Sequence, residues 1–132
     1  MDWLTTAREI FSHDIYATET TGIVIDEAEP GHAVCSFSID NRHLNANNTV
    51  MGGAIFTLAD FAFAIVCNLN RPSTVSSGSN ITYLAAPKGD RVTAEATLIR
   101  AGRRSCFATV EVRDSEGRQV AYFTGNGMVV DS

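Results

Sequence analysis

Asp60 is the residue whose type and position most suggest chemistry, because it is the one charged side chain in the most apolar stretch of the chain. Its surroundings run Ile55-Phe56-Thr57-Leu58-Ala59-Asp60-Phe61-Ala62-Phe63-Ala64-Ile65. An unpaired carboxylate among apolar side chains costs free energy unless it is protonated or finds hydrogen-bond donors. Asp60 is therefore either held by local donors in a polar notch, or it is a general base or nucleophile whose basicity is raised by burial.

A glycine pair, Gly52-Gly53, opens the same apolar stretch. If the stretch is a helix, the first N–H groups have no partner within the helix and lie at the positive end of its dipole. Such N–H groups suit a carbonyl oxygen that gains negative charge during a reaction, which is the role of an oxyanion hole. Close packing, or a turn without a catalytic role, is the alternative explanation for the two glycines.

Spacing decides how these two groups could act together. Gly52 and Asp60 are eight residues apart, which is about 12 Å along a helix that rises about 1.5 Å per residue. An aspartate side chain is too short to close that gap. Both groups can serve one carbonyl only if they come from different chains that meet across a two-fold axis, so the sequence predicts a homodimer with two shared sites.

The first half of the chain predicts one short helix and one hairpin. Apolar residues spaced three and four apart, Ile10 among them, predict an amphipathic helix over residues 2 to about 12, with Asp2 at its start. Alternating apolar residues on both sides of Pro30-Gly31 predict a β-hairpin that begins at Thr21.

The second half predicts a loop, a long helix and four strands. Residues 40–50 hold four asparagines and predict an irregular loop. The apolar run from Gly52 to near Asn68 favours no side, so we expect a helix surrounded by protein on most faces. Four segments rich in β-branched and aromatic residues predict antiparallel strands joined by short turns, over residues 74–86, 90–101, 104–113 and 118–130.

This order of elements predicts the α+β class. Strands joined by short turns form an antiparallel sheet, and the buried helix must lie against its apolar face. We expect a hotdog fold, with one long central helix wrapped by a curved antiparallel sheet of about five or six strands and a short N-terminal helix. A chain of 132 residues predicts a single domain over residues 1–132.

Composition excludes several classes of protein. With 45% hydrophobic and 19% charged residues the chain is expected to fold, and a net charge of −5 disfavours a nucleic-acid partner. The longest apolar run covers 14 positions, short of the roughly 20 that a membrane span needs. The N-terminus lacks the pattern of a signal peptide, which predicts a cytoplasmic protein. Three widely spaced cysteines in apolar surroundings are expected to be reduced core residues: Cys35, Cys67 and Cys106.

The stretch from His43 to Ala64 resembles the signature of the PaaI-type hotdog acyl-CoA thioesterases, the family related to the phenylacetate-degradation thioesterase. That signature runs LN, a short spacer, HGG and then LAD before small and aromatic residues. This chain has Leu44-Asn45, then Met51-Gly52-Gly53, then Leu58-Ala59-Asp60. The order of elements over nearly the whole chain agrees with the family as well.

The resemblance implies roles for individual residues. Asp60 would be the catalytic carboxylate, Gly52 would donate its N–H to the thioester oxygen, and Asn45 would help to orient carbonyl or water. Met51 stands where the family usually has histidine; methionine offers no proton and no comparable hydrogen bond, so low activity or an unusual substrate is expected. The residues expected to contact substrate are Gly53, Met51, Phe61, Arg103 and Arg104.

Two groups of residues could complete a substrate site. Arg103 and Arg104 belong to the densest basic cluster of the chain, with Lys88, Arg91 and Arg100. This cluster is either an ordinary solvated turn or a contact for the phosphates of coenzyme A. Three phenylalanines of the long helix either line an acyl pocket or pack in the core: Phe56, Phe61 and Phe63.

The function expected from these residues is hydrolysis of an aryl- or medium-chain acyl-CoA to a free acid and coenzyme A, with no cofactor. The enzyme is expected to be a homodimer that pairs into a dimer of dimers. No metal is expected, because His13, His32 and His43 lack ligand-like spacing. The alternative is a non-catalytic acyl-CoA or lipid-binding module of the same fold, which Met51 favours; a dehydratase would need a histidine and acid pair that the helix lacks. Gly125-Asn126-Gly127 is expected to be a bulge.

Overall fold

The computed structural model describes residues 1–130, which form one antiparallel sheet and the helices that pack on it. The six strands are β1 (Val24–Glu29), β2 (His32–Ser38), β3 (Thr74–Tyr83), β4 (Arg91–Ala101), β5 (Ser105–Asp114) and β6 (Gln119–Val129). Their order across the sheet is β1-β2-β4-β5-β6-β3. The predicted α+β hotdog architecture is confirmed, and each strand lies within a few residues of its predicted position.

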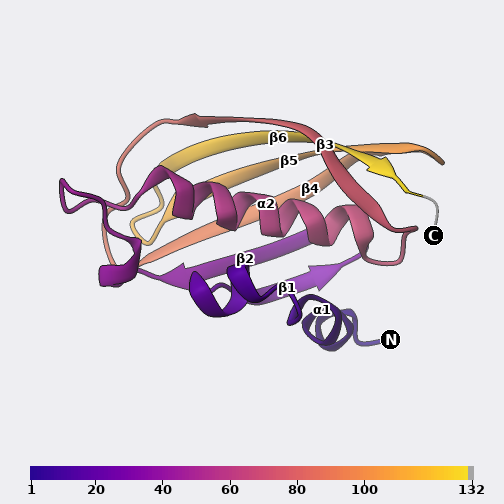
Figure 1. Cartoon of the computed structure of the whole chain (residues 1–132), viewed down its shortest axis with the longest axis horizontal. Helices are drawn as coiled ribbons and strands as arrows, with labels where there is room; N and C mark the ends of the chain where they lie inside the picture. Colours follow the sequence, from indigo (N-terminus) through magenta and orange to yellow (C-terminus); the bar gives the residue numbers. More distant parts are fainter. Residues whose placement is uncertain (131–132) are drawn as a thin grey trace.

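The long helix α2 (Gly52–Asn68) lies along one face of this sheet (Figure 1). It packs mainly against β2, β4 and β5. Leu58, Ile65 and Val66 are fully buried, and from Ala54 onward no residue of α2 is fully exposed. The prediction from the missing polar face is therefore confirmed: protein surrounds this helix on most sides.

The N-terminal helix α1 (Trp3–Phe11) packs beside β1 (Figure 1). Asp2 caps it as predicted, because its carboxylate accepts a hydrogen bond from the Thr5 N–H at 3.2 Å. Phe11 is buried and meets Phe61 of α2 edge-to-face at 6.2 Å. The assignment of Ile10 to the apolar face was wrong: the side chain is 52% exposed, because the buried stripe runs through Ala7 and Phe11 instead.

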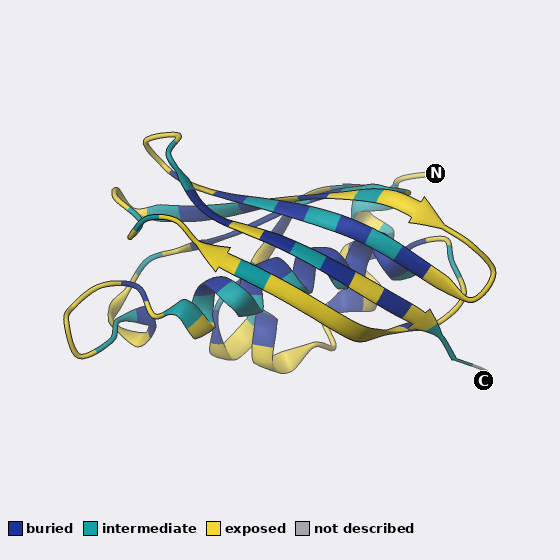
Figure 2. Ribbon diagram, turned by 90° about the horizontal axis from the view of Figure 1, so that it is seen from above, coloured by how far each residue is buried: buried dark blue, intermediate teal, exposed yellow. Residues whose placement is uncertain are grey.

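Strand β3 is an edge strand, which the sequence did not indicate. The prediction that short turns join consecutive neighbours holds for β4, β5 and β6 but is wrong for β3, which pairs with β6 rather than β4. Residues 84–90 therefore cross the end of the sheet to reach β4. Most of β3 is exposed (Figure 2), and a long exposed edge strand is a template for pairing with another chain.

The glycines near the end of β6 are not a bulge, contrary to expectation. Residues of β6 continue through this region without a break, and the register shift lies on β3 between Ser76 and Gly78. Gly125 and Gly127 have a packing role instead. A Cβ at Gly125 would lie 2.7 Å from Phe63, and one at Gly127 would lie 2.8 Å from the Cys106 sulfur.

The three cysteines are buried and carry free thiols, as predicted: Cys35, Cys67 and Cys106. Burial raises the pKa of the Cys35 and Cys67 thiols well above the ordinary value. Among the helices of residues 1–130, none combines the length and the hydropathy that crossing a membrane would require.

Candidate active site

The Asp60 carboxylate lies in a cavity of about 290 Å³ on the side of α2 that faces the N-terminal segment. One wall comes from α2, and the other comes from the chain before and within the π-helical turn Tyr16–Thr20. Its lining residues are Asp14, Ile15, Tyr16, Ala17, Thr57, Asp60, Phe61 and Ala64. Phe61, which was predicted to contact substrate, lies beside Asp60 in this lining.

Asp60 is half-buried, and among residues 1–130 it takes part in no ion pair and accepts no side-chain hydrogen bond. Burial raises its pKa above the ordinary aspartate value, and the negative charge of Asp14 raises that pKa further. Thr57 supplies no donor, because its hydroxyl donates to the Gly53 carbonyl at 2.8 Å. The explanation of Asp60 as a carboxylate held by local donors therefore fails, and a base with raised affinity for a proton fits the geometry.

The other predicted group, Gly52, lies at the start of α2. Met51 is the N-cap and makes no side-chain capping bond; its carbonyl accepts from the N–H groups of Ala54 and Ile55 at 3.0 and 3.3 Å. The N–H groups of Gly52 and Gly53 bind no acceptor within residues 1–130. Two adjacent backbone donors are thus available at the positive end of the helix dipole.

Gly52 lines a second cavity, of about 410 Å³, with the chain that follows β3. Its lining residues are Val50, Gly52, Ile55, Tyr83, Leu84, Ala85, Ala86 and Pro87. This cavity shares no lining residue with the cavity that holds Asp60. The structure therefore does not bring Gly52 and Asp60 of one chain to the same cavity, in agreement with their separation along the helix.

Tyr83 contacts Gly52 and was missed by the sequence analysis. Its hydroxyl donates to the Gly52 carbonyl at 2.9 Å, and a Cβ at position 52 would lie 3.0 Å from the tyrosine ring. Tyr83 thus explains why glycine occupies position 52 and holds the first turn of α2 in place. The alternation of β3 was the available signal, because Ile81 and Tyr83 share one face of the strand.

Asn45 builds the loop before α2. Its side-chain oxygen accepts from the Asn47 N–H at 2.9 Å and from the N–H and hydroxyl of Thr49, each at 3.2 Å. A bridge between Leu44 and Val50 closes the same loop. The side-chain oxygen of Asn45 is therefore occupied, which leaves its amino group as the part that can reach a ligand.

His43 anchors this loop to the core. The buried ring accepts from the Asp40 N–H at Nδ1 (3.0 Å) and donates from Nε2 to the Thr21 carbonyl (2.7 Å), so both nitrogens are used by a neutral tautomer. The ring also stacks on Phe37 with centroids 4.2 Å apart. His43 is therefore a structural residue of the site's scaffold. Within residues 1–130, no three His, Cys, Asp or Glu side chains gather where they could hold a metal ion.

Met51 and the remaining helix phenylalanines differ in exposure. Met51 is 56% exposed at the N-terminal end of α2 and offers no polar atom that could replace histidine. Phe63 and Phe56 both contact Phe123, with centroids 5.6 and 5.7 Å apart. Of the three phenylalanines considered for an acyl pocket, Phe61 and Phe63 both belong to the core, and Phe61 is the one that also lines the Asp60 cavity.

The predicted basic cluster is divided in the structure. Arg100 and Arg104 line a cavity of about 440 Å³ at the β4–β5 hairpin, and Arg103 is exposed in the same turn. Arg91 is nine residues from Arg100 along β4, which is about 30 Å at about 3.3 Å per residue. Grouping Lys88 and Arg91 with the other arginines was therefore wrong, because β4 is extended and separates its two ends.

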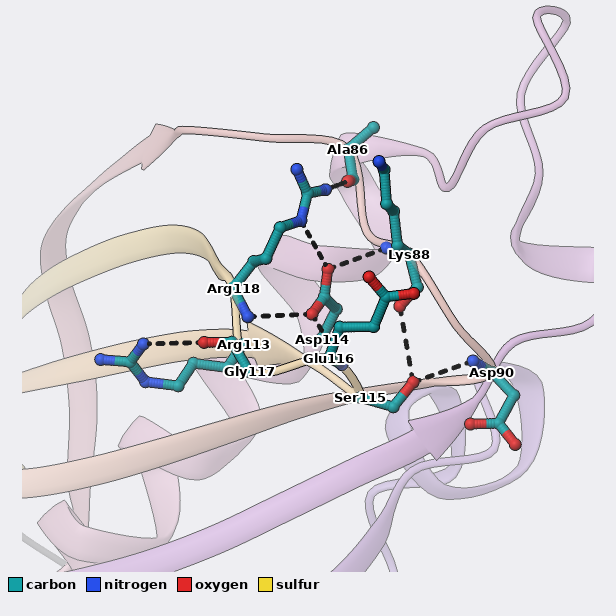
Figure 3. A network of polar contacts seen from close by, with 9 residues as sticks. All are labelled: Ala86, Lys88, Asp90, Arg113, Asp114, Ser115, Glu116, Gly117 and Arg118. Carbon is teal, nitrogen blue, oxygen red and sulfur yellow. Dashed lines mark hydrogen bonds and ion pairs between the residues drawn. The ribbon is translucent and has the colours of Figure 1, made fainter.

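A polar network around Asp114 fixes the crossing segment that walls the Gly52 cavity (Figure 3). Asp114 accepts from the Lys88 N–H at 2.9 Å, and from the N–H and the Nε of Arg118 at 3.0 and 3.2 Å. Arg118 also donates to the Ala86 carbonyl. The Lys88 N–H, together with the other donors, lowers the pKa of Asp114 to about 2. The turn after β5 thus holds the chain at residues 86–88.

Comparisons with known proteins were made against this geometry. Residues 47–121 match the family model described as the thioesterase superfamily. The acyl-coenzyme A thioesterase PaaI of Escherichia coli is 31% identical over 120 residues, 90% of this chain and 85% of that protein. The solved structure of E. coli PaaI superimposes with a TM-score of 0.86 at 28% identity, covering 98% of this chain and 97% of that one. A hypothetical thioesterase of Streptococcus pneumoniae, solved with coenzyme A, gives a TM-score of 0.85 at 28% identity, covering 95% and 98%.

Proposed function

This chain belongs to the thioesterase superfamily, and we propose that it hydrolyses an acyl-coenzyme A to the free acid and coenzyme A, with Asp60 as the catalytic carboxylate. Membership of the superfamily makes it an enzyme that cleaves thioesters. The observation that carries the assignment of Asp60 is its half-buried carboxylate, which faces a cavity and, within residues 1–130, has neither a hydrogen bond nor a neutralising cation. An aryl or medium-chain acyl group suits the apolar walls of that cavity.

The chemistry requires a base, a water molecule and a donor to the oxyanion. Asp60 takes a proton from water while the water oxygen bonds to the thioester carbon, and the carbonyl oxygen becomes an oxyanion. The N–H of Gly52, with that of Gly53, stabilises this oxyanion. When the C–S bond breaks, the thiolate of coenzyme A takes the proton from Asp60. Direct attack by Asp60 on the thioester carbon, which expels the thiolate and forms a mixed anhydride, is the other route. In a single turnover in ¹⁸O-water, label in the Asp60 carboxylate would show that route, with water attacking the aspartyl carbon of the anhydride.

We place each site between two chains. Within one chain Gly52 and Asp60 line separate cavities, so a complete site needs Asp60 from one chain and Gly52, with Asn45, from the other. The exposed β3 edge supports a two-fold dimer, because pairing of two such strands would continue the sheet and cover its unpaired N–H and C=O groups. Two dimers are proposed to associate further.

The phosphates of coenzyme A are assigned to the β4–β5 hairpin. Arg100 and Arg104 share a cavity there with Phe107, and Arg103 lies exposed beside them; guanidinium groups suit phosphate because they can donate two parallel hydrogen bonds. Arg91 is not available, because its guanidinium donates to the hydroxyls of Ser36 and Ser38 at 2.6 and 2.8 Å. The proposed reaction uses water and the carboxylate, with no cofactor. The three cysteines of the chain carry free thiols, which suits a protein of the cytoplasm, where we place the enzyme.

The test is release of coenzyme A, followed with a thiol reagent over a panel of aryl, short and medium-chain acyl-CoAs. Asp60→Asn keeps the size of the side chain and removes the base, so kcat should fall about 100-fold or more while the fold is retained. Asp90→Asn is the matched control, because Asp90 is an exposed aspartate just before β4 and lines neither cavity. An Asp60→Asn variant as active as the wild type would end the assignment.

A further inference from the structure

The wall opposite Asp60 carries a second carboxylate, Asp14. Both side chains line the cavity of about 290 Å³, and of its lining residues only Asp14, Tyr16 and Asp60 are titratable and none is basic. Among residues 1–130, the Asp14 carboxylate joins no salt bridge and accepts no side-chain hydrogen bond. Its backbone carbonyl, in contrast, accepts from both the N–H and the hydroxyl of Thr18, at 2.9 and 3.0 Å, so the position of Asp14 is fixed.

The basic groups near this segment are occupied or few. The Arg42 guanidinium donates to the Glu19 and Thr20 carbonyls and pairs with Asp40, and His13 directly precedes Asp14 in the chain without lining the cavity. Between Leu44 and Pro87, which includes α2 and β3, the charged residues are Asp60 and Arg71. Arg71 lies beyond the far end of α2, where its Nε donates to the Cys67 carbonyl at 3.1 Å. Apart from its own Asp60 and the distant Arg71, a partner that packs through α2 or β3 would therefore bring no charged side chain from this stretch, and the cavity stays anionic while both aspartates are ionised.

This charge decides which half of the substrate occupies the cavity. Coenzyme A carries several phosphate charges, so its phosphates are repelled by two carboxylates and attracted to arginines such as Arg100 and Arg104. The acyl half then points into the Asp60 cavity, whose remaining walls are largely apolar, with Ile15 and Phe61 among them. An acyl group that itself ends in a carboxylate would have to enter beside Asp14 and Asp60.

Resting on the proposed hydrolysis of acyl-CoA, we propose that Asp14 is a specificity-determining residue, which restricts the enzyme to acyl groups without negative charge. Asp14 itself is exposed and Asp60 opposite it is half-buried, so a third negative charge placed between them would meet two like charges, and such repulsion is a means of discrimination. The same charge acts on Asp60: the pKa of Asp60 is raised in part by Asp14, so removal of Asp14 lowers that pKa and moves the acid limb of the pH–rate profile to lower pH.

The experiment compares hexanoyl-CoA with adipoyl-CoA, which have acyl chains of equal carbon number and differ by one terminal carboxylate. Wild-type enzyme should prefer hexanoyl-CoA in kcat/KM by about 100-fold, and Asp14→Asn should reduce that preference at least about tenfold. Glu19→Gln is the matched control, because Glu19 is an exposed acid of the same segment outside the cavity lining; it should leave the preference unchanged. Binding of the corresponding S-hexyl and S-(5-carboxypentyl) thioethers, which have no cleavable carbonyl, is measured by calorimetry in parallel.

The outcomes separate this inference from the proposed function. Equal rates for the two thioesters in wild type, or equal preference in wild type and Asp14→Asn, overturns the role of Asp14 and leaves thioester hydrolysis intact. If no acyl-CoA is hydrolysed, the proposed function fails, and binding of the thioethers tests the role of Asp14. A wild-type preference for S-hexyl-CoA that is reduced in Asp14→Asn supports that role. Equal binding of both thioethers to the wild type overturns it. An unchanged acid limb in Asp14→Asn would also contradict the coupling to Asp60.

Discussion

Asp60 suits the role of base in the proposed reaction because its surroundings disfavour the ionised form of its carboxyl group. Burial and the neighbouring Asp14 both raise its pKa, which makes it a stronger base than a solvated aspartate. The sequence was sufficient to propose this residue, since a single carboxylate in an apolar helix is visible without a structure. Asp14 and Tyr83 could not be identified in the same way, because each acquires its role from a residue more than thirty positions away.

The same pKa shift predicts a gain of stability on substitution. When folding raises the pKa of a carboxyl group, the group's contribution to the free energy of unfolding is greatest below the ordinary aspartate pKa. That contribution is lost as the pH rises through the folded-state pKa. At neutral pH the ionised Asp60 therefore destabilises the fold. Asp60→Asn should raise Tm at pH 7 by about 2 to 5 °C, a difference that shrinks as the pH falls toward 4. Thermal unfolding across this pH range measures it; a lower Tm for the variant at pH 7 would contradict the account.

In the proposed mechanism, Tyr83 supports catalysis through the peptide that it binds. Its hydroxyl holds the Gly52 carbonyl, which belongs to the same peptide group as the Gly53 N–H. Tyr83→Phe should lower kcat by about tenfold or less, since one donor becomes less well oriented, and should change KM little. Steady-state kinetics with Tyr122→Phe as the control tests this, because Tyr122 is a tyrosine of β6 outside the Gly52 cavity. A change confined to KM would assign Tyr83 to substrate binding instead.

At the scale of elements, local pattern predicted the strands but not their arrangement. Alternation and turn residues located each of the four last strands, yet β3 pairs with β6 across about fifty residues of sequence. Turn length alone suggested that β3 would lie beside β4. The pairing depends on packing against α2 and on the path of residues 84–90, neither of which a local window contains.

The Asp114 network stabilises that crossing segment, and its pKa gives a second prediction of pH dependence. The folded-state pKa of about 2 lies below the ordinary value of 3.8, so the stabilising contribution is present above about pH 4 and is lost as the pH falls through about 2. Asp114→Asn should lower Tm at pH 7 by about 5 °C or more, because the partly buried N–H groups of Lys88 and Arg118 lose a charged acceptor. Denaturation of both proteins between pH 7 and 2 should show the difference narrowing; a constant difference would show that charge is not the cause.

At the scale of the whole molecule, the arrangement of charge supports the proposed orientation of the substrate. Arginines at one end of β4 suit the phosphates of coenzyme A, while two carboxylates occupy the cavity beside α2. The sequence grouped Lys88 and Arg91 with the arginines of the β4–β5 turn, and the extended strand separates them. The spacing of Gly52 and Asp60, in contrast, could be predicted in advance, because the rise of a helix fixes it.

The central claim is that each site takes Asp60 from one chain and Gly52 from the other, and complementation tests it most directly. Asp60→Asn and Gly52→Val are each expected to be inactive, the second because a side chain at position 52 meets Tyr83. Equal amounts are mixed, refolded together and assayed, with mixed dimers identified by mass. Half of the dimers should be mixed, each with one intact site of two, so the mixture should recover about a quarter of wild-type activity. Mixed dimers as inactive as either parent, or a fully active monomer, would contradict the shared site.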